Sequence, residues 1–309
     1  MRIGARTRGA ALLLAALSLT GCASAAAEQP KVDLVAQSDV HYLTVDGLER
    51  SYIAHVPEGA AASVPETLPV LVVLHGAGGN GPKAEMATGL SGFARADNFI
   101  VAYPNGTQAA QIEEQLAWNA DGCCGAPHID EVDDVEFISR MLDDIAERNA
   151  IDASRIYLAG FSNGGMMSYR LSCELGDRIA GIAVVGGAFN VSSCDSDAPA
   201  DVLIVHGTGD LTVPYRGGPT NERSAARFGQ WDNASVSDAR REWVERNGCA
   251  GFPSRNVDET VTRDTYDECD DDKRLEVVTI AGGAHVWPIA PVSGFDASEA
   301  LITFFGLGS

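Results

Sequence analysis

Short continuous runs of apolar residues alternate along this chain with segments in which apolar residues recur every three or four positions. The runs at 68–75 (LPVLVVLH) and 99–104 (FIVAYP), and the later runs RIYLAG, IAGIAVVGG, DVLIVHG and RLEVVTIAG, are typical of strands that a parallel sheet buries on both faces. Upstream, VHYLTVDGLERSYIAHVP gives two alternating runs joined at Asp46-Gly47, which predicts a hairpin. The pattern therefore predicts an α/β fold, with a mostly parallel doubly wound sheet and an N-terminal antiparallel hairpin.

The segment VDDVEFISRMLDDIAERN shows the helical pattern most clearly. Its apolar residues fall on one stripe, at Val135, Ile138, Leu142 and Ile145. Asp133 and Asp134 come just before this stripe, and we interpret both as helix-capping residues rather than as acid or base groups of a site. A second helix is predicted from Ser162 to about Leu175, and further helices over SDARREWVERNG and SEALITFFG.

Composition narrows the class of protein. A length of 309 residues, with 45 % hydrophobic and 21 % charged residues, fits one large folded domain and argues against disorder. No repeat or interior linker divides the chain, so we predict a single domain over 38–309. Because 22 basic against 43 acidic residues give a net charge of −21, the chain should repel nucleic acid and anionic lipid surfaces. We expect a monomer with no nucleic-acid partner.

The first 37 residues are expected to lie outside this domain. Three arginines precede an apolar run over 10–19, which is the layout of a secretory signal and is too short to span a bilayer. The run ends in LTGC, which resembles the lipobox of bacterial lipoproteins and implies a signal peptide over 1–21, lipidation of Cys22 and a tether over 22–37. The alternative is an ordinary cleaved signal with a chance cysteine. With the lipobox, the protein is exported and stays at the outer face of the membrane through its lipid alone, or is shed.

Six further cysteines suit an exported chain with up to three disulfides. Pairing the closest cysteines in sequence predicts one bond between Cys173 and Cys194 and another between Cys249 and Cys269. This leaves Cys123 and Cys124 as a vicinal bond or as free thiols, and 15 connectivities are open in all. Neither a Cys-x-x-Cys nor a His-rich spacing accompanies them, so we expect no metal and no cofactor.

The pentapeptide Gly160-Phe161-Ser162-Asn163-Gly164 stands where a predicted strand runs into a predicted helix. A nucleophilic serine needs this setting, because it sits on a sharp, strained turn where bulky neighbours would collide. Alone, the pattern also describes a Gly-rich turn. At a strand–helix junction of an α/β chain it makes Ser162 the candidate nucleophile.

A serine hydroxyl requires a base, and the order along the chain in this class of fold is serine, acid, histidine. His206 and His285 are the histidines that follow Ser162. His206 ends a strand, where packing or a backbone contact is the more usual role, whereas His285 lies in the flexible loop AGGAHVWP after the last strand. Asp210 follows the strand DVLIV, in a Gly-rich loop, so we predict it as the acid that orients His285. Its alternative role is a turn aspartate.

An ester-cleaving site also needs two backbone N–H groups for the oxyanion. Asn163, directly after the serine, is one candidate, and Ala77 in the Gly-rich loop LHGAGGNG is the other. Such a loop also suits phosphate, but no Gly-Lys-Ser/Thr follows. Trp118 and Trp287 are candidate walls of a substrate pocket, Trp118 with packing as an equal alternative.

Six segments together resemble one esterase family: HGAGG, AWNADGCCG, VDDVEFI, GFSNGGMM, HGTGDLTVPYRGG and GGAHVWP. The chain is similar to the polyhydroxybutyrate depolymerases, feruloyl esterases and acetylxylan esterases (carbohydrate esterase family one). The resemblance implies an α/β-hydrolase fold with Ser162, Asp210 and His285 as the triad. Ala284 stands where relatives often have glycine. We see no separate substrate-binding domain after the catalytic one, so efficient attack on solid polyester is not expected.

We therefore expect a secreted, lipid-anchored serine carboxylesterase that hydrolyses short acyl, feruloyl or hydroxybutyryl esters through an acyl-enzyme. Its partner is a small-molecule or oligomeric ester, and the acidic surface favours neutral substrates. One alternative is an acyltransferase to a sugar or lipid acceptor, since only water exclusion and acceptor access separate the two reactions. The other is a non-catalytic surface lipoprotein that retains the fold.

Overall fold

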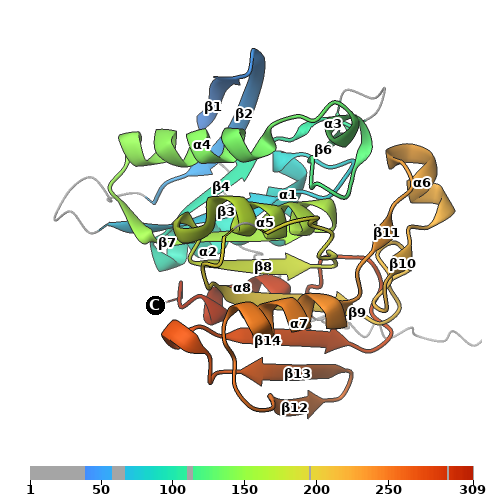
Figure 1. The fold of residues 1–309 in the computed structure, drawn as a ribbon. Coiled ribbons are helices and arrows are strands. Elements are labelled where there is room, and N and C mark those ends of the chain that lie inside the picture. The colour runs from blue at the N-terminus through green and yellow to red at the C-terminus, as the bar shows by residue number, and fades with distance from the viewer. Residues whose placement is uncertain (1–38, 58–66, 110–113, 195, 291, 309) are drawn as a thin grey trace, which may run out of the picture. The chain divides into compact units, whose positions relative to one another are not determined.

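The computed structural model describes residues 39–57, 67–109, 114–194, 196–290 and 292–308, all within the unit Gln37–Ser309. In this part of the chain one sheet of ten strands has the order β1-β2-β4-β3-β7-β8-β9-β14-β13-β12 (Figure 1). Its strands are β1 (Asp39–Val45), β2 (Leu48–His55), β3 (Leu68–Leu74), β4 (Ile100–Pro104), β7 (Ile151–Phe161), β8 (Gly181–Val185), β9 (Asp201–Gly207), β12 (Ser254–Asp258), β13 (Val261–Tyr266) and β14 (Leu275–Ile280).

The centre of the sheet is parallel and its two ends are antiparallel. Strands β4, β3, β7, β8, β9 and β14 run parallel to one another, as the apolar runs predict. The hairpin predicted at Asp46-Gly47 is present, with Val45 of β1 paired to Leu48 of β2. The antiparallel strands β13 and β12 at the other end were not predicted. All five residues of β12 are exposed, so this segment lacks the apolar pattern on which the prediction relies.

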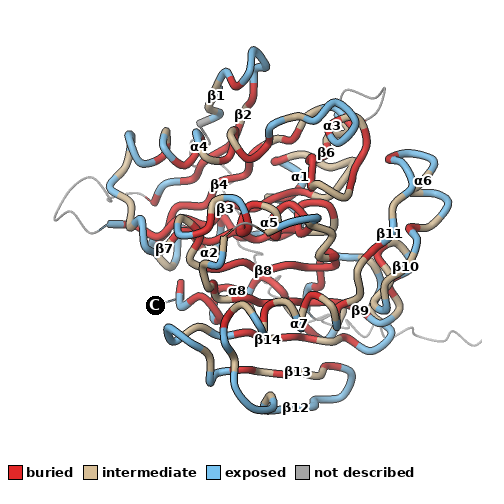
Figure 2. The backbone as a smooth tube through the Cα atoms, in the orientation of Figure 1, coloured by how far each residue is buried: buried red, intermediate tan, exposed pale blue. Residues whose placement is uncertain are grey.

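Helices cover both faces of the sheet (Figure 1). One face carries α4 (Asp134–Arg148), α5 (Asn163–Leu175) and α7 (Val236–Arg246), and the other carries α1 (Gly81–Thr88), α2 (Leu90–Asp97) and α8 (Ala297–Phe304). The side chains of β3 alternate between the two layers: Val70, Val72 and Leu74 pack on the first, and Leu71 and Val73 on the second. Figure 2 shows the result: the parallel strands at the centre of the sheet are buried along most of their length. The α/β, doubly wound prediction is confirmed.

Shorter elements lie at the ends of the strands. They are β5 (Thr107–Gln108), β6 (Leu116–Ala117), α3 (Gly125–Ile129), η1 (Gly176–Arg178), β10 (Gly218–Pro219), α6 (Glu222–Phe228), β11 (Asp232–Asn233) and η2 (Asp270–Asp272). Strands β5 and β6 form one two-stranded ribbon, and β10 and β11 form another. The second ribbon carries α6 away from the main sheet.

Helix α4 confirms the predicted apolar stripe, whose four residues are all buried. Asp133 caps the helix as expected, because its side chain accepts a hydrogen bond from the Glu136 N–H. The reading of Asp134 as a cap is wrong. Its carboxylate is fully buried and forms an ion pair with Arg50 of β2 at 2.6 Å. Because Arg50 is 84 residues away in the sequence, the residues around Asp134 give no indication of this ion pair.

The structure pairs the six described cysteines as Cys173–Cys194, Cys249–Cys269 and the vicinal Cys123–Cys124. The vicinal pair lies next to the first residue of α5, with the Asn163 Nδ2 atom 3.5 Å from each sulfur. The signal peptide over 1–21, Cys22 and the tether over 22–37 lie outside the described residues. Searched over the described part alone, the chain contains no helix long and apolar enough to cross a membrane.

Candidate active site

Ser162 stands on a sharp turn between β7 and α5. Its backbone has φ 56° and ψ −121°, a conformation that costs a residue with a side chain of the order of 1–3 kcal/mol. The turn is held by the Ser162 N–H, which donates to the Val185 carbonyl at 2.9 Å. The hydrogen bond to β8 therefore keeps Ser162 in this strained conformation, as expected for a nucleophile elbow.

Two glycines make this turn sterically possible. A Cβ at Gly160 would lie 2.2 Å from the Gly164 carbonyl oxygen, and a Cβ at Gly164 would lie 2.2 Å from the Leu74 carbonyl oxygen. Both distances are far inside van der Waals contact. The bracketing glycines are thus required by the close approach of β7, α5 and β3, which is the reason proposed from the pentapeptide.

Ser162, His285 and Asp210 form one hydrogen-bonded chain. The His285 Nδ1–H donates to Asp210 Oδ2 at 2.6 Å, which leaves Nε2 to accept from the Ser162 hydroxyl at 3.0 Å. Asp210 Oδ1 accepts from the Thr212 and Val213 N–H groups, both at 2.8 Å, so that the carboxylate is fixed in its loop. The three side chains come from the ends of β7, β9 and β14, which are brought together by the parallel register of the sheet.

His206 is a fourth member that the sequence did not reveal. Its Nε2–H donates to the Val213 carbonyl at 2.9 Å and lies 3.4 Å from Asp210 Oδ2. The backbone contact fits the role expected for His206, but the approach to Asp210 was missed. Burial alone would raise the pKa of Asp210. Hydrogen bonds from His206 and His285 outweigh it and hold that pKa well below its usual range.

The Asn163 side chain, next to Ser162, holds the backbone of Trp118 through two hydrogen bonds. Asn163 Oδ1 accepts from the Trp118 N–H at 2.8 Å, and its Nδ2 donates to the Trp118 carbonyl at 3.0 Å. The indole Nε1–H of Trp118 donates to the His75 carbonyl at 2.9 Å, and its side chain is 0 % exposed. Of the two roles considered for Trp118, substrate contact and packing, the buried side chain fits packing. The residue packs under the site.

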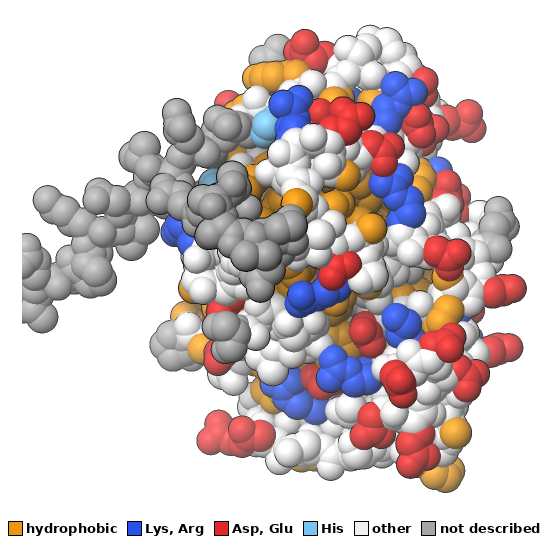
Figure 3. Space-filling view, turned by 90° about the vertical axis from the view of Figure 1, so that its left-hand side faces the viewer, with side chains coloured by type: hydrophobic (Ala, Val, Ile, Leu, Met, Phe, Trp, Pro, Cys, Tyr) orange, Lys and Arg blue, Asp and Glu red, His pale blue; other side chains and the backbone are white. Residues whose placement is uncertain are grey.

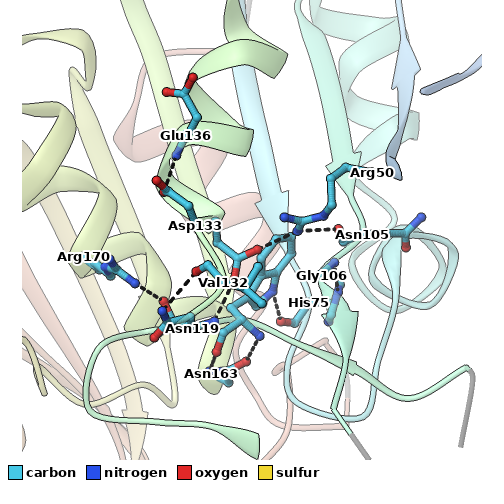
Figure 4. A network of polar contacts seen from close by, with 12 residues as sticks. Arg50, His75, Asn105, Gly106, Asn119, Val132, Asp133, Glu136, Asn163 and Arg170 are labelled. Atoms are coloured by element: carbon cyan, nitrogen blue, oxygen red, sulfur yellow. Dashed lines mark hydrogen bonds and ion pairs between the residues drawn. The ribbon is translucent and has the colours of Figure 1, made fainter. Parts of the chain in front are cut away.

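A buried ion pair extends this network (Figure 4). Asp134 Oδ1 accepts from Arg50, and its Oδ2 accepts from the Asn119 N–H at 2.7 Å. Asn119 in turn donates through Nδ2 to the Val132 carbonyl at 3.0 Å, and the carbonyl of Asn119 accepts from Arg170 at 2.6 Å. The residue after Trp118 is thus held from several sides. We call the connected set the floor of the site: Arg50, His75, Trp118, Asn119, Asp134 and Asn163.

His75 directly follows β3 and belongs to the floor rather than to the reacting groups. Its Nε2 accepts from the Gly106 N–H at 3.0 Å, so Nδ1 carries the proton that faces the Gly76 carbonyl at 2.9 Å. Burial lowers the pKa of His75 to about 4, which keeps the ring neutral at pH 7. It supports the loop that carries Ala77.

Two cavities meet at His285. The first, of about 270 Å³, is lined by Ser162, His285 and the two oxyanion candidates, Ala77 and Asn163. The second, of about 540 Å³, is mostly apolar and lies on the other side of His285. Trp287 lines this second cavity, with its Nε1–H donating to the Ser298 hydroxyl at 3.0 Å. The placement of Ala77, Asn163 and Trp287 is compatible with their predicted roles, which remain predictions.

The segment 218–233, formed by β10, α6 and β11, completes the first cavity. Arg223, Arg227, Phe228 and Trp231 of this segment all line it. We call 218–233 the arm. Sequence reasoning assigned no function to it, although two arginines four residues apart, followed by two aromatics, stand shortly after Asp210. Over the described residues no group of His, Cys, Asp and Glu side chains is arranged to hold a metal ion.

Comparison with known proteins places this geometry among esterases. A family model described as "Phospholipase/Carboxylesterase" matches residues 60–240, which include Ser162 and Asp210. Feruloyl esterase B of Piromyces equi is 30 % identical over 246 residues, 76 % of this chain and 42 % of that protein. Feruloyl esterase C of Emericella nidulans is 30 % identical over 178 residues, 55 % of this chain and 58 % of that protein. The chain thus spans about half the length of these curated relatives.

Among solved structures, an acetyl xylan esterase from Aspergillus awamori aligns with a TM-score of 0.61 at 14 % identity. The alignment covers 87 % of this chain and 100 % of that one. At such low identity the likeness concerns the fold, which is that of the α/β hydrolases.

Proposed function

The chain belongs to the phospholipase/carboxylesterase family of α/β hydrolases, and from this premise we propose that it is a serine esterase that cleaves carboxylic esters through an acyl-enzyme. The observation that carries the proposal is the hydrogen-bonded chain from Asp210 through His285 to Ser162, at 2.6 and 3.0 Å. A serine, a neutral imidazole and an ionised carboxylate in this order are what general-base activation of an alcohol requires.

In the first half of the reaction, the Ser162 hydroxyl attacks the ester carbonyl carbon. His285 Nε2 takes the hydroxyl proton as the C–O bond forms, and Asp210 stabilises the imidazolium through Nδ1–H. The carbonyl oxygen becomes an oxyanion, for which the N–H groups of Asn163 and Ala77 are the proposed donors. His285 then returns its proton to the departing alcohol, which leaves the acyl group on Ser162.

In the second half, a water molecule takes the place of the alcohol. His285 removes its proton, the resulting hydroxide attacks the acyl carbonyl, and collapse of the second tetrahedral intermediate releases the acid and restores the Ser162 hydroxyl. The Asp210 carboxylate stays ionised throughout. Its lowered pKa supports this part of the proposal, because protonation of Asp210 would remove the acceptor that orients the ring.

The substrate class is proposed from the relatives and from the two cavities. The two feruloyl esterases carry names that point to feruloyl esters. The apolar cavity beside Trp287 has room for the nonpolar part of such an ester. We include short acyl, feruloyl and hydroxybutyryl esters in the proposed class, since each combines a small acyl group with an alcohol.

The decisive test is turnover of 4-nitrophenyl butyrate by the native protein and by Ser162→Ala. We expect release of 4-nitrophenol with a burst that equals the enzyme concentration, and a mass increase of one butyryl group on trapped native protein. The Ser162→Ala variant should show neither, while its circular dichroism spectrum matches that of the native chain. Equal inactivity of both proteins would instead favour a non-catalytic binding protein, and accumulation of acylated alcohols with a sugar acceptor would favour an acyltransferase.

We further propose that the protein is exported and lipid-anchored through Cys22. The LTGC segment and the three disulfides among the described cysteines support this, since disulfides persist in oxidising compartments. Metabolic labelling with a fatty acid tests it: label should enter the native chain and be absent from Cys22→Ala. Label in both variants, or in neither, contradicts the proposal.

A further inference from the structure

The charged side chains that line the cavity around Ser162 are opposite in sign to the net charge of the chain. The protein carries 22 basic and 43 acidic residues, and Asp and Glu side chains are spread over the face shown in Figure 3. By contrast, the described residues that line the cavity include Arg223 and Arg227 and no aspartate or glutamate. A lining that has two guanidinium groups and no aspartate or glutamate, in the cavity that contains the nucleophile, suits an anionic ligand.

Arg223 has spare binding capacity. Its side chain is exposed, and no hydrogen bond, ion pair or ring contact ties the guanidinium to another residue of the described chain. Arg227 is held more firmly: Nη2 donates to Gln115 Oε1 at 2.5 Å, and the guanidinium lies 5.0 Å from the Phe228 ring centre. A guanidinium has five N–H donors, so most of those on Arg227 remain open to a ligand.

The arm holds these arginines at a constant place relative to the triad. Asn221 Nδ2 donates to the Leu211 carbonyl at 3.0 Å and to the Thr212 hydroxyl at 3.2 Å, directly after Asp210. Asn221 Oδ1 also caps α6 by accepting from the Ser224 N–H at 2.9 Å. The carboxylate loop and the start of α6 are therefore one connected piece.

Arg227 also lies close to the loop that carries Ala77. A Cβ built on Gly78, the next residue, would be 3.7 Å from Arg227 Nη2 and 3.3 Å from Phe228 Cζ. The guanidinium thus borders the proposed oxyanion site from one side, while Arg223 lines the same cavity. An anion bound by both would be positioned relative to a scissile ester at Ser162.

We propose that Arg223 and Arg227 bind a carboxylate that the ester substrate carries in addition to its scissile bond, so that the site prefers anionic esters. The planar guanidinium fork matches a carboxylate and forms two parallel hydrogen bonds to it. The inference rests on the proposed esterase function and specifies its substrate class. It reverses the expectation of neutral substrates, which was drawn from the net charge of the whole chain and not from the charge of the pocket.

The test compares matched esters. On the acyl side, the mono-4-nitrophenyl esters of succinate, glutarate and adipate place the carboxylate at increasing distance, with 4-nitrophenyl butyrate as the neutral reference. On the alcohol side, the butyrate ester of 4-hydroxybenzoate is compared with that of methyl 4-hydroxybenzoate. The variants are Arg223→Gln, Arg227→Gln and both together. Arg216→Gln is the control, since Arg216 is exposed nearby and does not line the cavity.

We expect the double variant to lower kcat/KM for at least one anionic ester about tenfold, which is within the range of charge-assisted pairs, and to lower kcat/KM for the neutral reference by a clearly smaller factor. The preference of the native enzyme should shrink when salt is raised from 0.05 to about 1 M, because screening shortens the reach of the charges. The side on which the effect appears identifies the part of the substrate that bears the carboxylate. An equal loss for anionic and neutral esters, no loss, or the same loss in Arg216→Gln overturns the inference and leaves the esterase function standing.

A second measurement separates the two proposals. Titration calorimetry of free glutarate with the Ser162→Ala protein needs no turnover, and we expect binding that the double arginine variant reduces about tenfold. If the native protein cleaves no ester of either series, the esterase function fails, and the calorimetry alone then decides on the arginines. Binding that is absent, or unchanged by the arginine substitutions, overturns the anion site.

Discussion

The floor and the arm both border Ser162, but they are built in different ways. The floor is buried and every side chain in it is held by partners from distant elements, such as Arg50 and Asp134 or Trp118 and Asn163. The arm is a short ribbon and helix whose arginines are exposed and, for Arg223, free of partners within the described chain. The floor keeps groups in place, whereas the arm offers groups to a ligand.

The two regions differ because catalysis and substrate selection make different demands on the structure. The reacting serine needs a strained backbone, and strain persists only where the surrounding structure over-determines it. Selectivity needs the reverse, because a side chain that is already satisfied cannot recognise anything further. Substitutions in the floor should therefore change the stability of the whole domain, and substitutions in the arm should change what the site binds and, at most, the local stability of the arm.

The largest effect should come from the reacting chain itself, which both regions hold in place. Asp210→Asn keeps the shape of the carboxylate but favours the wrong tautomer of His285, and in a serine protease of this arrangement the same change costs about 10⁴-fold in kcat. We expect a loss of that order for 4-nitrophenyl butyrate, with an unchanged circular dichroism spectrum. A loss below tenfold would contradict the role given to Asp210.

Breaking the floor at its ion pair should unfold the domain more easily. Asp134→Ala leaves the buried guanidinium of Arg50 without its partner, and such changes typically cost about 3–5 kcal/mol of unfolding free energy. The matched control is Asp133→Ala, one residue away on the same helix, which removes only the cap and should cost about 1 kcal/mol. Urea unfolding measures both. Equal costs for the two substitutions would show that the ion pair does not stabilise the floor.

The floor should also make stability depend on pH through His75. Its folded pKa of about 4 lies below the ordinary value of 6.5, so the unfolded chain binds the extra proton between these pH values. Protonation therefore favours unfolding. The contribution of His75 is complete above about pH 7 and declines as the pH falls from 6.5 to 4, by about 3 kcal/mol in total.

His75→Gln tests this pH dependence, because glutamine does not titrate and retains an acceptor for the Gly106 N–H. Urea unfolding at several pH values between 4 and 7 should give a flatter profile for the variant than for the native chain. His41→Gln, on the exterior strand β1, serves as the control. Parallel profiles for native protein and His75→Gln would rule out His75 as the source.

The smallest effect on stability should come from the arm. Asn221→Ala removes the cap of α6 and its link to the Asp210 loop, at a local cost of about 1 kcal/mol. Hydrogen exchange of 218–233 should become faster while the unfolding midpoint of the domain shifts little, since local opening does not require global unfolding. For anionic esters KM should rise more than kcat falls. A large drop in the unfolding midpoint would mean that the arm is part of the core.

Several parts of this picture were accessible from local patterns. The parallel strands could be predicted from their apolar runs. The need for Gly160 follows from contacts within one strand–turn–helix segment, although Gly164 is also required by its approach to β3. The choice of His285 over His206 required only the chain order and the loop in which each stands. These features depend on the residues next to them, and the folded chain brings them together as expected.

Other features escaped because they depend on distant segments. Trp118 is an aromatic in a loop near the site, and nothing local says whether the loop turns its indole outward or, as it does, under Ser162. Asp134 resembles its neighbour Asp133 in sequence, but only one of them meets Arg50. The arm could not be recognised from the sequence, because only the fold places its arginines in the lining of the cavity with Ser162.

The chemical groups of the chain, their order and the secondary structure that presents them follow from the sequence alone. Periodicity and steric demand act over a few residues, so these can be read along the chain. Folding in three dimensions sets which side chains face the reacting serine, which are buried under it, and that two arginines line the pocket of an acidic protein. Burial and local charge are sums over residues far apart in sequence, and only packing brings their contributions to one place.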